Sequence, residues 1–158
     1  MARPGDPGIG GLTKSGPPCM LGGPMIAFRT PAAATAAPTI LLAEGDDSLR
    51  MWLGRILRET GYDVLEAGSG PEVLRHLRSR VPIHLVITDA RVGRTPGWEI
   101  AQETSAILPG VSVVRLISSP SEGLPICRAD LDPSVLVWKP VTLDRLLHVV
   151  RAYVRPEP

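Results

Sequence analysis

Short apolar runs alternate with amphipathic helical patterns along residues 39–154, and this alternation constrains the fold more than any other feature of the sequence. The apolar runs have the length and the β-branched content of buried strands. We expect strands over 39–43, 62–67, 84–88, 111–117 and 135–138. Strands separated by helices form parallel sheets with helices on both faces, because a crossover helix connects each strand to the next. The pattern therefore predicts a doubly wound α/β fold.

Capping residues and turn signals mark where the predicted helices begin and end. Two of the helices are expected to begin within Ser69–Glu72 and near Trp98. Thr142 is expected to cap the last helix, and Asp47 or Ser48 the first. Gly61 ends the first of them, since glycine favours the left-handed conformation that follows many helices. Residues 120–134 contain three prolines and only a weak helical pattern. A fourth helix there is expected to be short and broken.

Residues 1–38 differ sharply in composition from the remainder of the chain. They contain seven Pro, seven Gly and seven Ala, with Phe28 as their one aromatic residue. Such a segment cannot bury enough apolar surface to offset the entropy lost on ordering. We therefore predict a disordered Pro/Gly/Ala-rich tail over 1–38 and one folded domain over 39–155.

Charge, apolar runs and cysteines exclude several classes of protein. The formal net charge of the 158 residues is +1, so the chain lacks a broad positive field for nucleic acid or an anionic membrane. The sequence has no apolar stretch long enough for a transmembrane helix and no signal-peptide core. Cys19 and Cys127 form neither a disulfide framework nor a metal cluster. A reducing cytoplasmic location is expected.

Polar groups follow four of the predicted strands at the points where these strands end. These groups are Glu44, Asp89, Ser118 and Lys139. The carboxyl ends of parallel strands share one edge of the sheet, where such folds bind ligands. Lys139 is the only lysine after residue 38, against thirteen arginines. A compact ammonium suits point contact with a carboxylate or a phosphoryl oxygen, so the set predicts a site rather than an ordinary polar rim.

The chemistry available to these four residues is phosphoryl transfer. Carboxylates on neighbouring strand ends repel each other unless a cation lies between them, and Mg²⁺ prefers such oxygen ligands. A carboxylate can also act as the nucleophile towards a phosphoryl group. The transfer then needs positive charge and a hydroxyl group at the phosphoryl oxygens, which Lys139 and Ser118 supply.

Over residues 39–154 the chain resembles a response-regulator receiver domain of bacterial two-component signalling. The matching segments are Ile40–Asp47, Gly61–Val64, Val86–Asp89, Leu116–Ser118 and Trp138–Pro140. The resemblance implies a flavodoxin-like sheet of five parallel strands in the order 2-1-3-4-5, with helices on both faces.

The resemblance also assigns roles to residues. It implies that Asp89 is the phosphoacceptor, Lys139 the phosphate-sensing lysine and Ser118 the switch hydroxyl. Glu44, Asp89 and the backbone carbonyl of Arg91 would hold Mg²⁺, and Pro140 would follow a cis peptide bond. A histidine kinase or a phosphotransfer protein would donate the phosphoryl group, and a downstream protein would receive the signal.

Two positions depart from the receiver pattern. Receivers usually place two consecutive acidic residues at the end of the first strand, and here the pair reads Glu44-Gly45. Asp46 is the alternative metal ligand, although its side chain should leave the turn in another direction. Leu136 stands where receivers carry the aromatic residue that reports the switch. These departures, together with the proline-broken segment 120–134, favour a second hypothesis, a receiver-like protein-binding module that works without phosphorylation.

We expect a stand-alone receiver rather than an enzyme or a DNA-binding regulator. Nothing after Val154 resembles a recognition helix with a basic face. The chain also lacks the G-x-S-x-G turn of α/β-hydrolases and a glycine-rich phosphate loop after the first strand. A signalling domain that accepts a phosphoryl group on Asp89 is the primary hypothesis.

Overall fold

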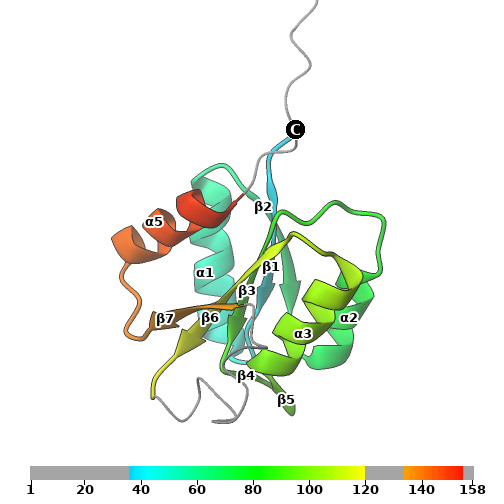
Figure 1. Ribbon diagram of the computed structural model, residues 1–158. Helices are drawn as coiled ribbons and strands as arrows, with labels where there is room; N and C mark the ends of the chain where they lie inside the picture. The colour runs from blue at the N-terminus through cyan, green and yellow to red at the C-terminus, as the bar shows by residue number, and fades with distance from the viewer. Residues whose placement is uncertain (1–35, 120–133, 155–158) are drawn as a thin grey trace, which may run out of the picture. The chain divides into compact units, whose positions relative to one another are not determined.

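The computed structural model describes residues 36–119 and 134–154, which form a five-stranded parallel sheet with helices on both faces (Figure 1). The strands are β1 (Thr39–Ala43), β2 (Asp63–Ala67), β3 (Leu85–Asp89), β6 (Ser112–Ile117) and β7 (Ser134–Trp138). Their spatial order is β2-β1-β3-β6-β7. Numbered among themselves along the chain, these strands have the order 2-1-3-4-5, so the predicted fold is confirmed.

A short antiparallel hairpin after β3 was not expected from the sequence. It pairs β4 (Arg91–Val92) with β5 (Thr95–Pro96). Gly93 in the connecting turn has a φ of +60°, a conformation that glycine adopts without steric cost. The hairpin keeps the chain beside the carboxyl edge of the sheet, directly after Asp89, before the next helix begins.

Four helices cover the two faces of the sheet in the described part of the chain (Figure 1). They are α1 (Asp47–Glu59), α2 (Gly70–Leu77), α3 (Gly97–Ile107) and α5 (Leu143–Tyr153). Leu53 and Leu57 of α1 share one apolar core with Leu146 and Val150 of α5. The residues Val73, Leu77, Ile100 and Ala101, from α2 and α3, belong to a second core on the other face. The inner strands β1 and β3 are thus buried on both sides, which explains their continuous apolar runs.

The ends of α1 differ in one detail from the sequence prediction. The N-cap is Asp46, one residue earlier than expected, and its Oδ1 accepts a hydrogen bond of 2.8 Å from the backbone N–H of Leu49. This bond satisfies one of the N–H groups that a helix start leaves without a partner. Gly61 follows the helix with a φ of +98°, as its predicted role at the helix end requires.

Two predictions fall largely outside the described residues. The predicted tail over 1–38 and the weakly patterned segment 120–134 lie outside the described ranges, apart from residues 36–38 and 134. Within the described ranges, no helix has both the length and the apolar character needed to cross a bilayer.

Candidate functional site

Asp89 and Lys139 form the centre of the site at the carboxyl edge of the sheet. The Lys139 Nζ lies 2.6 Å from the Asp89 Oδ1, although 50 positions separate the two residues in the sequence. Their side chains are 20% and 25% exposed, so the pair is partly shielded from water but still accessible. Asp89 is the last residue of β3, and Lys139 directly follows β7. Parallel strands therefore bring together the two groups that the sequence predicted to meet.

Backbone contacts hold both members of this pair in place. Oδ1 of Asp89 also accepts a 2.8 Å hydrogen bond from the N–H of Ala90. A Cβ atom at Gly97 would collide with the carbonyl oxygen of Asp89, so glycine allows the start of α3 to pack directly against the strand end. The N–H of Lys139 donates to the carbonyl of Ile117, and the Lys139–Pro140 bond is cis, as the resemblance implied.

Glu44 is the buried carboxylate of the site, with only 3% of its surface exposed. Its Oε1 accepts a hydrogen bond of 3.0 Å from the N–H of Asp46. Its Oε2 is buried and has no hydrogen-bond partner. Burial raises the pKa of the Glu44 carboxyl, and the negative charge of Asp89 raises it further, whereas the Asp46 N–H and Lys139 oppose the shift. An orphaned, buried carboxylate oxygen is costly, and a cation or a proton would relieve this cost.

Gly45 lies against the hairpin that follows Asp89. A Cβ atom at Gly45 would be 3.2 Å from the backbone nitrogen of Gly93 and 3.9 Å from the carbonyl oxygen of Arg91. The Arg91 carbonyl, a predicted metal ligand, is therefore close to the turn after β1. The same geometry shows that any side chain at position 45 needs a small shift of the hairpin backbone.

The oxygen donors at this edge fit Mg²⁺. They provide one carboxylate fewer than a site with two consecutive acidic residues after β1. Glu44, Asp89 and the Arg91 carbonyl supply oxygen donors, and the orphaned Oε2 of Glu44 is one of them. The alternative ligand, Asp46, uses Oδ1 to cap α1. The described ranges contain no group of three or more Asp, Glu, His or Cys side chains placed so that together they could hold a metal ion. Mg²⁺ often binds through one or two carboxylates, several waters and a phosphate oxygen, and this site can supply that set.

Ser118 follows the last residue of β6 and is exposed at the same edge of the sheet. Ile117 ends the strand, is 1% exposed and pairs with Trp138. The chain thus places the Ser118 hydroxyl beyond the last strand pair. Its predicted role as the switch hydroxyl stays a prediction. Leu136, at the position where an aromatic residue was expected, is 38% exposed on β7.

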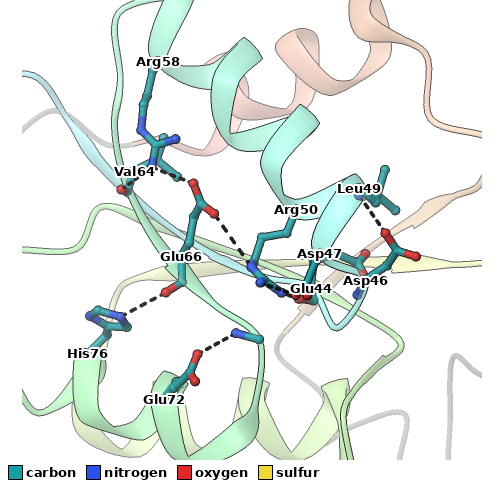
Figure 2. A network of polar contacts seen from close by, with 11 residues as sticks. Glu44, Asp46, Asp47, Leu49, Arg50, Arg58, Val64, Glu66, Glu72 and His76 are labelled. Atoms are coloured by element: carbon teal, nitrogen blue, oxygen red, sulfur yellow. Dashed lines mark hydrogen bonds and ion pairs between the residues drawn. The ribbon is translucent and has the colours of Figure 1, made fainter.

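Arg50 supports the backbone of Glu44, although no pattern in the sequence predicted this role. Its Nη1 donates a 2.7 Å hydrogen bond to the carbonyl of Glu44, and its guanidinium also contacts Asp47 and Glu66 (Figure 2). Glu66 in turn forms an ion pair of 2.7 Å with Arg58. This network ties the turn after β1 to β2 and so fixes the backbone that carries Glu44.

Two glycines make room for this network. A Cβ at Gly54 would lie 2.7 Å from the Glu66 Oε1, and one at Gly68 would lie 2.9 Å from the Arg50 Nη1. The sequence offered one signal for this network: Arg50 lies in the first turn of α1, four residues before Gly54 in the same helix. It was weak because neither feature identifies the distant partner, Glu66.

Three curated proteins with similar sequences are response regulators or transcriptional regulators. The chain is 30% identical over 112 residues to the response regulator receiver protein CpdR of Brucella abortus, and the match covers 70% of this chain and 92% of CpdR. It is 32% identical over 111 residues to the transcriptional regulatory protein GlrR of Escherichia coli, covering 70% of this chain. It is 30% identical over 116 residues to the response regulator RR06 of Streptococcus pneumoniae, covering 73%.

The extent of these matches differs between the relatives. The chain spans 25% of the length of GlrR and 52% of that of RR06. No protein-family model matches the sequence.

Solved structures of receiver proteins have the same fold as this chain. A response regulator receiver protein from Sinorhizobium medicae superimposes with a TM-score of 0.63 at 28% identity, covering 75% of this chain and 94% of that one. A receiver domain protein from Clostridium thermocellum has a TM-score of 0.66 at 24% identity, covering 74% and 94%. The second likeness concerns the fold alone.

Proposed function

The chain belongs to the response-regulator receiver family of two-component signalling, and we propose that its Asp89 accepts a phosphoryl group from a histidine kinase or a phosphotransfer protein. The observation that supports this proposal is the 2.6 Å contact between Lys139 Nζ and Asp89 Oδ1 at the carboxyl edge of the sheet. It places a compact positive charge beside an accessible carboxylate. We further propose that this receiver works as a stand-alone domain that signals to a separate protein.

The two oxygens of Asp89 have different surroundings, and this difference suggests how the reaction proceeds. Oδ1 accepts hydrogen bonds from Lys139 and Ala90, and neither of these contacts involves Oδ2. Oδ2 is therefore the nucleophile in our proposal. It attacks the phosphorus atom of a phosphohistidine, a new O–P bond forms as the P–N bond breaks, and the departing imidazole takes up a proton from water. The product is an acyl phosphate on Asp89.

Lys139 and Ser118 would act on the transferred group without forming bonds to phosphorus. Charge on the phosphoryl oxygens is stabilised by fixed positive charge and hydrogen-bond donors, which supply most of the catalysis in phosphoryl transfer. The ammonium of Lys139 can move from Asp89 to a phosphoryl oxygen, because its flexible stem rotates. The exposed Ser118 hydroxyl follows β6 at the same edge and would donate a hydrogen bond to another phosphoryl oxygen.

Receiver domains generally bind Mg²⁺ for phosphorylation, and in this chain Glu44, Asp89 and the Arg91 carbonyl would hold the ion. Bound Mg²⁺ neutralises charge between the carboxylates and the phosphoryl group. Because Gly45 offers no carboxylate, we expect weak binding of Mg²⁺ alone and tighter binding once a phosphoryl oxygen is present. Glu44 remains the side chain that gains most from the ion, since its Oε2 lacks a partner.

Labelling with a small-molecule phosphodonor tests the proposed function. The full chain is incubated with acetyl phosphate and Mg²⁺, and the mass of the intact protein is measured. We expect one added phosphoryl group on the wild type and none on Asp89→Asn. Asp63→Asn is the matched control, because Asp63 is exposed at the start of β2, on the opposite edge of the sheet. Equal labelling of wild type and Asp89→Asn would refute the proposed role of Asp89.

The glycine at position 45 supports a second candidate function, a receiver that binds its partner without being phosphorylated. This alternative requires that Mg²⁺ does not reach the site at physiological concentrations. Trp138 adjoins Lys139 and is 51% exposed, so its fluorescence can report on ion binding. Saturable quenching at millimolar Mg²⁺ would count against this alternative, and a flat titration would favour it.

A further inference from the structure

A groove between α2 and α3 lies on the face of the sheet opposite α1 and α5. Its volume is about 460 Å³. Pro71 and Leu74 line it from α2, Trp98 lines it from the first turn of α3, and Thr95 of β5 also lines it. The two helices contact each other along this face (Figure 1). The groove is separate from the carboxylate–lysine site, whose side chains are not among its lining residues.

The floor of the groove is apolar and partly open to water. Leu74 and Trp98 are partly buried, and Leu74 packs against the core beneath α2 and α3. Pro71 is exposed at the rim. Gly70 allows α2 to start against the hairpin, because a Cβ atom there would collide with the Thr95 hydroxyl. A preformed apolar channel between two helices has the shape that receives the apolar face of a third helix.

The charged side chains that line the groove are all negative. Glu99 and Glu103 line it from α3, and no lysine, arginine or histidine does so. Both carboxylates are exposed, and they lie four residues apart, on the same side of the helix. Neither takes part in an ion pair of the described residues. Like charges at this spacing repel each other, so a cationic partner would relieve an unfavourable arrangement.

We propose that the groove binds a basic amphipathic helix of a partner protein. Its apolar side chains would contact Leu74 and Trp98, and its lysine or arginine side chains would pair with Glu99 and Glu103. A cation beside Trp98 gains additional stabilisation from the face of the indole ring. This inference goes beyond the proposed phosphoryl transfer and does not depend on it.

A designed peptide provides the test. The probe is a synthetic peptide of about 18 residues, long enough to form a helix, with leucines on one face and lysines on the other. It is added to the full ¹⁵N-labelled chain, and the shifts of the amide resonances are followed. We expect the shifts to be confined to α2, α3 and β5, and the affinity to fall as salt is added.

Two matched double variants separate a specific site from general attraction. Glu99→Lys with Glu103→Lys reverses the charge of the groove, and we expect affinity to fall by about tenfold or more. Asp63→Lys with Asp144→Lys reverses two exposed carboxylates outside the groove and should leave the affinity nearly unchanged. Circular dichroism checks that both variants fold.

Four results would overturn the proposal. One is an equal loss of affinity in both double variants, which would mean that only net charge matters. Another is equal binding of a peptide with the same composition but scrambled apolar positions. The third is the absence of shifts in α2 and α3 at about 1 mM peptide, which would leave no affinity of biological use. Sedimentation of the chain without peptide identifies self-association, and burial of this groove between two copies would also contradict the proposal.

Discussion

The two sides of Asp89 differ in how completely their polar groups are satisfied. On the lysine side, which comprises Lys139 and the end of β6, the ammonium contacts Asp89 and the backbone N–H of Lys139 donates to Ile117. On the acidic side, which comprises Glu44, Gly45 and the Arg91 carbonyl, one buried carboxylate oxygen has no partner. The proposed phosphate-contacting lysine is therefore already held by its neighbours, whereas the proposed metal-binding side keeps one unsatisfied carboxylate oxygen.

Removal of the Lys139 ammonium should have the largest effect on the rate of labelling. We predict that Lys139→Ala lowers the rate of labelling by acetyl phosphate on the order of 10²-fold, because a fixed positive charge is removed from the reacting group. Lys139→Arg should recover little of this loss, since a planar guanidinium does not replace a compact ammonium at a single oxygen. Initial rates from intact-protein mass measure the effect.

Arg151→Ala serves as the control for the lysine prediction. Arg151 is exposed near the end of α5, so its loss removes a positive charge without touching the site. If Lys139→Ala labels as fast as Arg151→Ala, the lysine side has no part in the transfer.

On the acidic side, an added carboxylate should strengthen the binding of Mg²⁺. We predict that Gly45→Asp strengthens Mg²⁺ binding on the order of tenfold, because it adds a carboxylate near Glu44 and the Arg91 carbonyl. Quenching of Trp138 fluorescence measures the affinity. Gly45→Ala is the matched control, since it brings the same Cβ to within 3.2 Å of the Gly93 nitrogen but carries no oxygen. Equal affinities for the two variants would show that position 45 does not limit the metal site.

The smallest effect concerns stability and its dependence on pH. Glu44→Gln keeps the acceptor for the Asp46 N–H and replaces the orphaned oxygen with a neutral amide. We predict that the variant is more stable than the wild type at pH 7 by about 1 kcal/mol, as measured by urea denaturation without Mg²⁺.

The pH dependence of this gain follows from the raised pKa of Glu44. The unfolded chain releases the Glu44 proton at a lower pH than the folded chain does, so ionisation costs the folded state stability as pH rises. The gain from Glu44→Gln should therefore grow from about pH 4.5 upwards and disappear below it. A gain that is independent of pH would show that the charge of Glu44 is not the cause.

The fold could be predicted because it rests on patterns that the sequence states directly. Strands β1 and β3 are buried on both sides, so each contains an apolar run such as Leu85–Ile87, whereas the edge strand β2 alternates. Helices separate the strands along the chain. Lys139 and Asp89 could be brought together from the sequence, since parallel strands end at one edge. What remained hidden depends on local backbone geometry, as with Asp46, which caps α1, and the hairpin closed by Gly93.

The arginine network could not be predicted for a related reason. Arg50 contacts the Glu44 carbonyl and Glu66 only because Gly54 and Gly68 leave space for these side chains. A single sequence shows that glycines are present but does not show which side chain fills the space beside them. The partner of a long side chain is set by tertiary packing, and periodicity carries no information about it.

The proposed role of Asp89 can be tested by locating the phosphoryl group on the chain. The wild-type protein is labelled with acetyl phosphate and Mg²⁺, the acyl phosphate is reduced with borohydride, and the resulting homoserine is located by peptide mass spectrometry. We predict homoserine at position 89 and at no other aspartate. Homoserine at Asp46 or Asp47 instead, or a labelled protein with an unchanged Asp89, would contradict it.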